Sequence, residues 1–140
     1  MYLTLHGVGK SFKNNTDEPV RVLENIDFDI KKGQFVSIVG PSGCGKSTLL
    51  YLISGLEKVT EGEIQVAGKK VTGPNPNRIV VFQEDGLFPW ATVLDNVTYG
   101  LLLKKKPKQE AKEKAIEMLK TVHLSKYIDA YPHQLSGGMK

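Results

Sequence analysis

The first half of the chain contains short apolar segments, several of them with the spacing of strands. Residues 25–30, NIDFDI, alternate apolar and acidic side chains, which predicts a half-buried strand. Residues 62–71, GEIQVAGKKV, alternate in the same way and include two glycines, which predicts an antiparallel hairpin. Two continuous apolar runs complete the predicted strands: QFVSIV at 34–39 predicts a more buried strand, and RIVVF at 78–82 predicts another short apolar strand.

Helical spacing is found at three places. Residues 47–56, STLLYLISGL, have the apolar density of a buried helix that ends at Gly55. Thr92 and Asp95 have the spacing of a capping box, which predicts a helix over VLDNVTYGLLL. Pro107 suits a first helical turn. The residues after it place one apolar stripe on a helix, formed by Ala111, Ala115, Leu119 and Val122.

Composition narrows the class of protein only slightly. Hydrophobic residues make up 40% and charged residues 24% of the 140 residues, as in an ordinary globular domain. No apolar run reaches the roughly 18 residues of a membrane helix, and the N-terminal residues lack the features of a signal peptide. The single cysteine, Cys44, allows no internal disulfide. The net charge of +4 is mild and aromatic residues do not interleave with basic ones, so we expect no nucleic-acid partner.

The segment GPSGCGKST carries the chemistry of the first half. It fits the pattern G-x-x-x-x-G-K-[ST], and it lies between a predicted strand and a predicted helix. The glycines let successive backbone N–H groups face one anion, Lys46 adds a charge for the β- and γ-phosphates, and the Ser47 hydroxyl can bind Mg²⁺. The alternative is a chance glycine turn. The expected nucleotide-binding residues are Gly40, Pro41, Ser42, Gly43, Cys44, Gly45, Lys46, Ser47 and Thr48.

Cys44 stands within this phosphate loop, and two interpretations of it stay open. A thiol at a helix N-terminus can have a lowered pKa, which would allow redox sensing. Alternatively, Cys44 simply fills a permissive position for a small residue.

Three further segments resemble the ATP-binding subunits of ABC transporters. VVFQEDGLFPWATVLDNV resembles their glutamine loop, LSGGM resembles their signature, and Phe12 in GKSF matches their adenine-stacking aromatic residue. The resemblance covers essentially all 140 residues. It implies an α/β fold of the P-loop NTPase class, with a RecA-like core, an antiparallel β-subdomain and the start of a helical subdomain. The nucleotide-binding part is expected at 1–85, and the helical part, up to the signature, at 86–140.

The resemblance also implies a role for each matching residue, with ATP and Mg²⁺ as cofactors. Phe12 would stack on adenine. Gln83, the catalytic residue present, would reach the same Mg²⁺ as Ser47 through its amide oxygen and sense the γ-phosphate. The signature would bind the γ-phosphate of a nucleotide held by a second copy, through Leu135, Ser136, Gly137, Gly138 and Met139.

The stretch EDGLFPWATVLDNVTYGL is most like that of importers of nitrate, sulfonate and taurine. Trp90 would then lie near the groove that receives a coupling helix of the membrane permease, or it would anchor the core of the helical part. The basic run KKKPK would contact lipid headgroups or mark a solvated helix boundary.

In the resembling family the signature is followed by a magnesium-binding Asp, a catalytic Glu and a switch His, and none of these is among the 140 residues. We therefore expect this chain to bind nucleotide with reduced affinity and to hydrolyse ATP poorly. We also expect self-association through an unpaired edge beside the strand before the phosphate loop, and a mobile tail at residues 137–138.

The expected function is that of an ATP-binding subunit that couples ATP binding and hydrolysis to solute import. The resemblance implies a cytoplasmic protein, peripheral on the inner face of the membrane. Its partners would be permease subunits, a second ATPase subunit, most simply in a homodimer, and indirectly a solute-binding protein. Two alternatives are a soluble ABC ATPase of DNA repair or translation and a non-catalytic nucleotide-binding interaction module.

Overall fold

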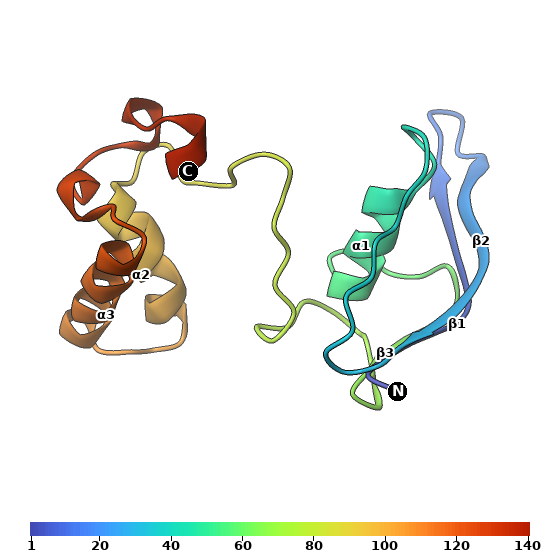
Figure 1. Cartoon of the computed structure of the whole chain (residues 1–140). Helices are drawn as coiled ribbons and strands as arrows, with labels where there is room; N and C mark the ends of the chain where they lie inside the picture. The colour runs from blue at the N-terminus through green and yellow to red at the C-terminus, as the bar shows by residue number, and fades with distance from the viewer. The chain divides into compact units, whose positions relative to one another are not determined.

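The structure is a computed structural model that describes all 140 residues. The chain divides into two compact units, Met1–Val81 and Phe82–Lys140, which are shown in Figure 1. Each unit has its own cluster of buried apolar side chains. The longest helix has 14 residues, and no helix combines the length and apolar character needed to span a bilayer.

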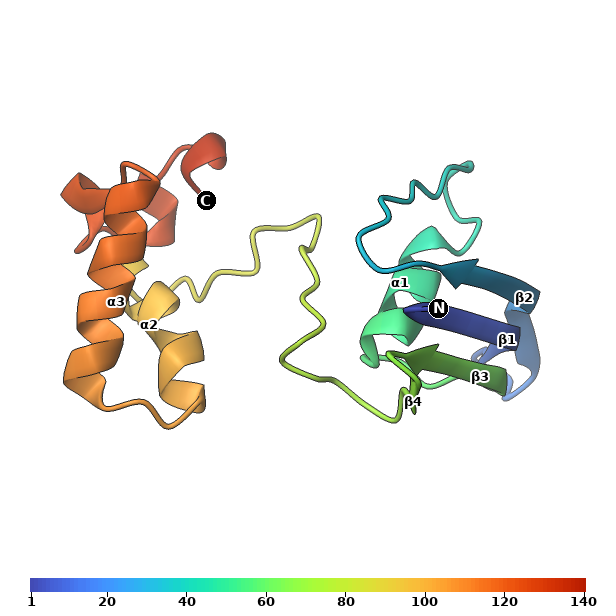
Figure 2. The same ribbon diagram turned by 60° about the horizontal axis from the view of Figure 1, so that its bottom comes forward.

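A four-stranded antiparallel sheet of order β2-β1-β3-β4 forms the first unit (Figure 2). The long strands β1 and β2 pair along most of their length, and β3 pairs with the other side of β1. This arrangement confirms the predicted strand at 25–30 and the predicted antiparallel hairpin at 62–71. The strands are β1 (Leu3–Lys13), β2 (Pro19–Ile30), β3 (Glu61–Val66) and β4 (Lys69–Lys70).

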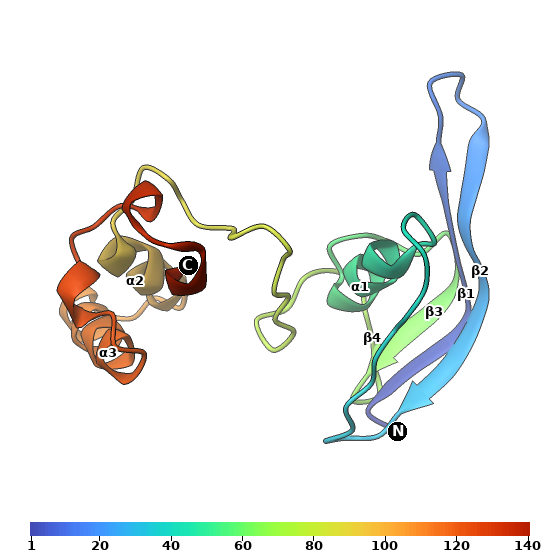
Figure 3. The same ribbon diagram turned by 45° about the horizontal axis from the view of Figure 1, so that its top comes forward.

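Helix α1 (Lys46–Ser54) covers one face of this sheet (Figure 3). Its buried Leu49 and Leu52 side chains join the apolar cluster formed by the strands. Burying one such side chain contributes roughly 1.5–3 kcal/mol, so this contact is the main attachment of the helix. The predicted helix is confirmed, although Leu50 is half exposed and only one side of the helix is buried.

Gly55 ends α1 in the left-handed conformation, with φ 84°, as its position in the sequence predicted. Its N–H donates to the carbonyl oxygens of Tyr51 and Leu52. A Cβ at Gly55 would lie 2.2 Å from the carbonyl oxygen of Gly73, so the chain passes directly against the helix end. The Arg78 guanidinium fastens this crossing by donating to the carbonyl oxygens of Ser54 and Gly73.

The two continuous apolar runs do not form strands, and both predictions are wrong for this structure. Residues 34–39 and 78–82 lie outside the single sheet. Phe35 is 90% exposed and Val81 is 92% exposed. A strand needs a neighbouring strand for its backbone hydrogen bonds. A strand with apolar side chains on both faces also needs other elements packed against both faces. Neither run has a paired strand here, so apolar composition alone does not produce β-structure.

The second unit is a pair of neighbouring helices followed by three short 3₁₀ turns (Figure 1). Thr92 caps the first helix, because its Oγ1 accepts from the Asp95 N–H at 3.1 Å, which confirms the predicted cap. The core side chains are Val93, Leu94, Ala115, Leu119 and Leu135. The elements are α2 (Val93–Leu103), α3 (Lys108–Thr121), η1 (Ser125–Tyr127), η2 (Pro132–Gln134) and η3 (Gly137–Met139).

The predicted apolar stripe of α3 is mostly confirmed. Ala111, Ala115 and Leu119 are buried, but Val122 is 59% exposed, because the helix ends one residue earlier. The residues from Lys104 to Lys106 form the exposed turn between α2 and α3. The basic run thus lies at an exposed helix boundary, and contact with lipid headgroups stays a prediction.

Replacing Gly55 by alanine should destabilise the first unit by roughly 2–4 kcal/mol, through left-handed strain and the clash with Gly73. Gly68→Ala is the matched control: Gly68 also has positive φ, 72°, but no atom lies within 4 Å of an added Cβ. It should cost about 1 kcal/mol. Urea titration followed by the NMR amide signals of β1 and α1 measures both values, and equal losses would contradict the proposed clash.

Candidate functional site

The start of α1 presents several unpaired backbone donors. The first hydrogen bond of the helix joins the Leu49 N–H to the Gly45 carbonyl oxygen at 2.9 Å. The N–H groups of Lys46, Ser47 and Thr48 precede this bond, so they have no acceptor within the helix. No side chain caps this end. Together with the helix dipole, these donors make the start of α1 suited to an anion.

The loop before α1 keeps its shape through two glycines in the left-handed region. Gly43 has φ 80° and Gly45 has φ 94°. A Cβ at Gly45 would lie 2.7 Å from Leu23 Cδ2 and 3.3 Å from the Val22 carbonyl oxygen. Gly45 thus allows the loop to lie directly on strand β2, which a larger residue would prevent.

Lys46 folds back over the phosphate loop. Its Nζ donates to the carbonyl oxygens of Gly40, at 2.8 Å, and Pro41, at 2.7 Å. An ammonium group has three N–H donors, and the third faces Cys44 Sγ at 3.7 Å. A phosphate oxygen is a much better acceptor than this sulfur. The loop can therefore keep the lysine in place while its charge reaches a bound polyphosphate.

The Cys44 thiol packs against Gly40. A Cβ at Gly40 would lie 2.7 Å from the Cys44 sulfur. This contact supports the interpretation of Cys44 as a small side chain that fits the loop, paired with a glycine opposite it.

Phe12 lies on the same pair of strands as the phosphate loop. Phe12 on β1 is opposite Val20 on β2. Val20 precedes Leu23, whose side chain approaches Gly45, by three residues of β2. Three residues of strand span roughly 10 Å. The Phe12 side chain is partly open, at 39% exposure. The structure therefore brings an accessible aromatic ring and a phosphate-type loop to one pair of strands.

The remaining predicted site residues belong to the second unit. Gln83 is exposed and lies outside any strand, contrary to the expected strand end. In the signature, Leu135 is buried in the core, whereas Ser136, Gly137 and Gly138 are exposed. The structure thus places Phe12 and the phosphate loop on the same strand pair. In the signature, Leu135 packs in the core of the second unit, together with the partly buried Met139 at its edge.

Backbone and side-chain contacts order the chain around the signature. The Ser136 carbonyl oxygen accepts from the Met139 N–H at 3.0 Å, which closes the turn η3. Upstream, Gln134 Oε1 accepts from the Tyr131 N–H at 2.8 Å. Lys140 forms an ion pair with Asp85 at 3.2 Å, so the signature end is tied to the segment that follows Gln83.

An aromatic groove of about 560 Å³ lies on the second unit, beside α2 and α3. Phe88 contacts both Trp90, with ring centroids 5.6 Å apart, and Tyr99, at 4.8 Å. Trp90 is 76% exposed, so the interpretation of Trp90 as a core anchor is wrong. Leu102 and Lys112 also line the groove. It is thus a mainly apolar surface with two lysines, Lys108 and Lys112, and Asp95 in its lining.

Asn96 organises this groove, and the sequence analysis missed it. Its Oδ1 accepts from the Phe88 N–H at 2.8 Å. Its Nδ2 donates to the carbonyl oxygens of Phe88, Ala91 and Thr92 at 2.9–3.2 Å. One amide side chain therefore fixes the backbone of 88–92. The available signal was an asparagine inside a predicted helix, where this residue is intrinsically unfavourable.

Comparison with known proteins places the chain in a family. It matches the family described as ABC transporter over residues 23–140. An uncharacterized ABC transporter ATP-binding protein of Methanocaldococcus jannaschii is 48% identical over 138 residues, which are 99% of this chain and 51% of that protein. The aliphatic sulfonates import ATP-binding protein SsuB of Bacillus cereus is 45% identical over 139 residues, 99% of this chain and 54% of SsuB.

A solved structure gives the same result. A dimeric ATP-binding cassette in a post-hydrolysis state, bound to ADP and Pi, matches with a TM-score of 0.80 and 36% identity. The match covers 98% of this chain and 64% of that chain. The chain belongs to the ABC transporter family, and it spans about half the length of these curated relatives. The predicted resemblance and the P-loop NTPase class of the α/β fold are confirmed.

Replacing Asn96 by alanine should destabilise the second unit by roughly 2–4 kcal/mol, because the polar contacts of its side chain with four backbone groups are lost. Gln109→Ala is the control: this exposed amide makes one bond, to Glu113, and its loss should change stability by less than about 0.5 kcal/mol. The only tryptophan, Trp90, reports unfolding of this unit by fluorescence in urea. An Asn96→Ala protein as stable as the control would contradict the assigned role.

Proposed function

We propose that this chain forms the N-terminal part of an ATP-binding subunit of an ABC importer, with a small oxyanion such as a sulfonate, nitrate or taurine as the transported solute. The observation that carries the proposal is the phosphate loop at the start of α1, with Lys46 folded over it and Phe12 on the adjoining strand pair. The aliphatic sulfonates import protein among its relatives supports the solute class.

In this proposal, residues 1–85 bind the nucleotide. The adenine stacks on Phe12, and the segment 40–48 surrounds the phosphates. The Ser47 hydroxyl and the Gln83 amide oxygen are hard oxygen donors, which suit Mg²⁺. The ion would neutralise charge on the phosphates, while the loop N–H groups and Lys46 orient them.

Residues 86–140 form the helical part and present the signature to a second copy. The exposed Ser136, Gly137 and Gly138 are available for contact with a phosphate group, while buried Leu135 anchors them. A homodimer would place each signature at the nucleotide of its partner. The dimeric state of the solved cassette supports this arrangement.

Hydrolysis by the 140-residue chain should be poor. Among the proposed site residues, none is a carboxylate that could activate water at the γ-phosphate, and Gln83 is neutral. General-base catalysis requires such a group within reach of the water. We therefore propose nucleotide binding for these 140 residues, whereas ATP hydrolysis is an activity of the family.

The aromatic groove is the proposed docking surface for the permease. Its exposed Trp90 and its apolar walls suit the buried face of a short amphipathic helix. Such a contact would hold the subunit on the cytoplasmic face of the membrane, with the solute-binding protein acting through the permease.

Mg-ATP should bind the chain with micromolar or weaker affinity, and Lys46→Ala should weaken binding about tenfold or more, because a charge-assisted contact is lost. Lys32→Ala, an exposed lysine of the same unit, should leave the affinity unchanged. Isothermal titration calorimetry measures all three proteins. Equal affinities for the two alanine variants would contradict phosphate binding at the loop. Submicromolar affinity, or ATP turnover abolished by Lys46→Ala, would contradict the reduced activity proposed for these residues.

Trp90→Ala should reduce co-purification with a co-expressed permease of a sulfonate importer at least several-fold, because exposed aromatic side chains dominate such contacts. Leu103→Ala is the control, since Leu103 is also exposed on α2 but does not line the groove. Unchanged recovery with Trp90→Ala would argue for the soluble or non-transport alternatives.

A further inference from the structure

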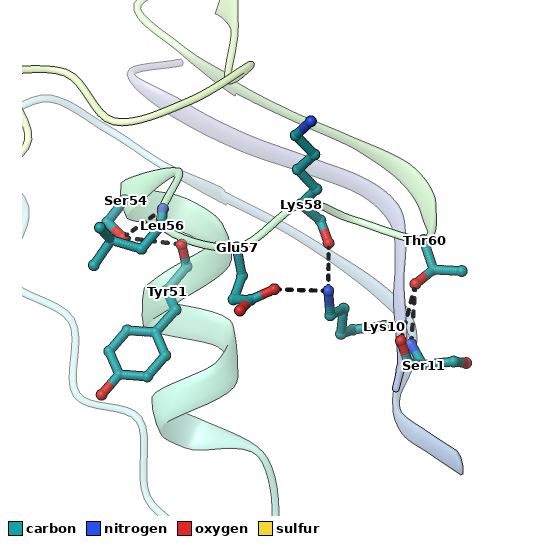
Figure 4. Close-up of polar contacts among 8 residues, drawn as sticks. All are labelled: Lys10, Ser11, Tyr51, Ser54, Leu56, Glu57, Lys58 and Thr60. Atoms are coloured by element: carbon teal, nitrogen blue, oxygen red, sulfur yellow. Dashed lines mark hydrogen bonds and ion pairs between the residues drawn. The ribbon is translucent and has the colours of Figure 1, made fainter. Parts of the chain in front are cut away.

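Lys10 is a buried lysine in the middle of strand β1. Its relative exposure is 9%, which is unusual for a lysine. Its Nζ donates to Glu57 Oε2 at 2.9 Å and to the Lys58 carbonyl oxygen at 2.9 Å (Figure 4). These two acceptors compensate the buried charge. They also hold the ammonium group at one position between the sheet and the segment after α1.

The same ammonium group lies over the ring of Phe12. Lys10 Nζ is 4.5 Å from the ring centroid, which is within the range of a cation–π contact. The pairing of β1 with β2 is irregular between Lys10 and Ser11, so it is this contact that shows the two side chains on the same side of the strand. One face of Phe12 is therefore occupied by Lys10, and a flat ligand can stack only on the other face.

The acceptors of Lys10 connect it to α1, the helix that begins at the phosphate loop. The Glu57 N–H donates to the Tyr51 carbonyl oxygen near the end of that helix, at 3.1 Å. Thr60 holds the other end of the segment on β1: its Oγ1 accepts from the Ser11 N–H at 3.1 Å (Figure 4). The segment 57–60 thus links β1, which carries both Lys10 and Phe12, to the end of α1.

We propose that Lys10 is a positioning residue for the base of the bound nucleotide. It fixes the Phe12 ring by its charge, and it fixes the ring relative to α1 through Glu57 and Lys58. The inference rests on the proposed binding of ATP, with Phe12 stacked on adenine. It adds a residue, with its supporting segment, that sets where the aromatic platform stands relative to the phosphate loop.

A purely structural role for Lys10 makes a different prediction. If Lys10 only held the sheet to α1, its loss would disturb the whole unit and weaken every ligand of the phosphate loop. If it positions the platform, its loss weakens ligands that contain a base and spares those that consist of phosphates alone. Comparing ATP with inorganic triphosphate therefore separates the two roles.

The test measures the affinities of ATP and inorganic triphosphate for the full 140-residue chain by calorimetry. Lys10→Met keeps the length of the side chain and removes its charge. It should weaken ATP binding by about three- to tenfold and leave triphosphate binding within twofold. Lys13→Met is the matched control, because Lys13 is an exposed lysine next to Phe12 on the same strand. It should leave both affinities unchanged. The NMR ring signals of Phe12 should shift in Lys10→Met and not in Lys13→Met.

Other variants keep the test decisive. If Lys10→Met does not fold, Glu57→Ala removes one anchor at a partly exposed site and should weaken ATP binding selectively, by a smaller factor. Equal losses for both ligands, equal effects of Lys10→Met and Lys13→Met, or unchanged ATP binding would overturn the role of Lys10. Phe12→Leu tests the underlying proposal separately: if it leaves ATP binding unchanged, base stacking on Phe12 fails, whatever Lys10 does.

Discussion

The packing of α1 against the antiparallel sheet is the interaction on which the candidate site depends. Leu49 and Leu52 hold the helix to the strands, and this attachment determines where the start of the helix lies. Gly45 then brings the loop onto β2 at a distance that no side chain would allow. The unpaired N–H groups and the charge of Lys46 are local properties of the loop and helix start, but their place beside the sheet follows from this packing.

The same sheet links the two ends of the proposed nucleotide site. Phe12 on β1 pairs with β2 and the phosphate loop lies against β2, so both ends of the proposed site belong to one pair of strands. Lys10 and Glu57 add a second connection, from the strand to the far end of α1. Because the proposed site is held from two sides, the protein would lose little conformational freedom when a nucleotide binds to both ends.

The second unit carries the surfaces proposed for protein partners. Its buried core holds Leu135, which anchors the exposed glycines of the signature. Its polar network, centred on Asn96, presents Phe88 and Trp90 at the groove. Each surface is thus supported by a buried contact beneath it. The phosphate loop and the aromatic groove thus lie on different clusters of buried side chains.

The sequence by itself determined the features that depend on local chemistry. These were the phosphate loop, the helix that ends at Gly55, the cap at Thr92 and the antiparallel hairpin, since each is decided by neighbouring residues. Tertiary structure decided the rest. The runs at 34–39 and 78–82 have strand composition but no paired neighbour, and strands exist only in pairs. Lys10 also resembles an ordinary strand lysine until Glu57, distant in the sequence, is brought beside it.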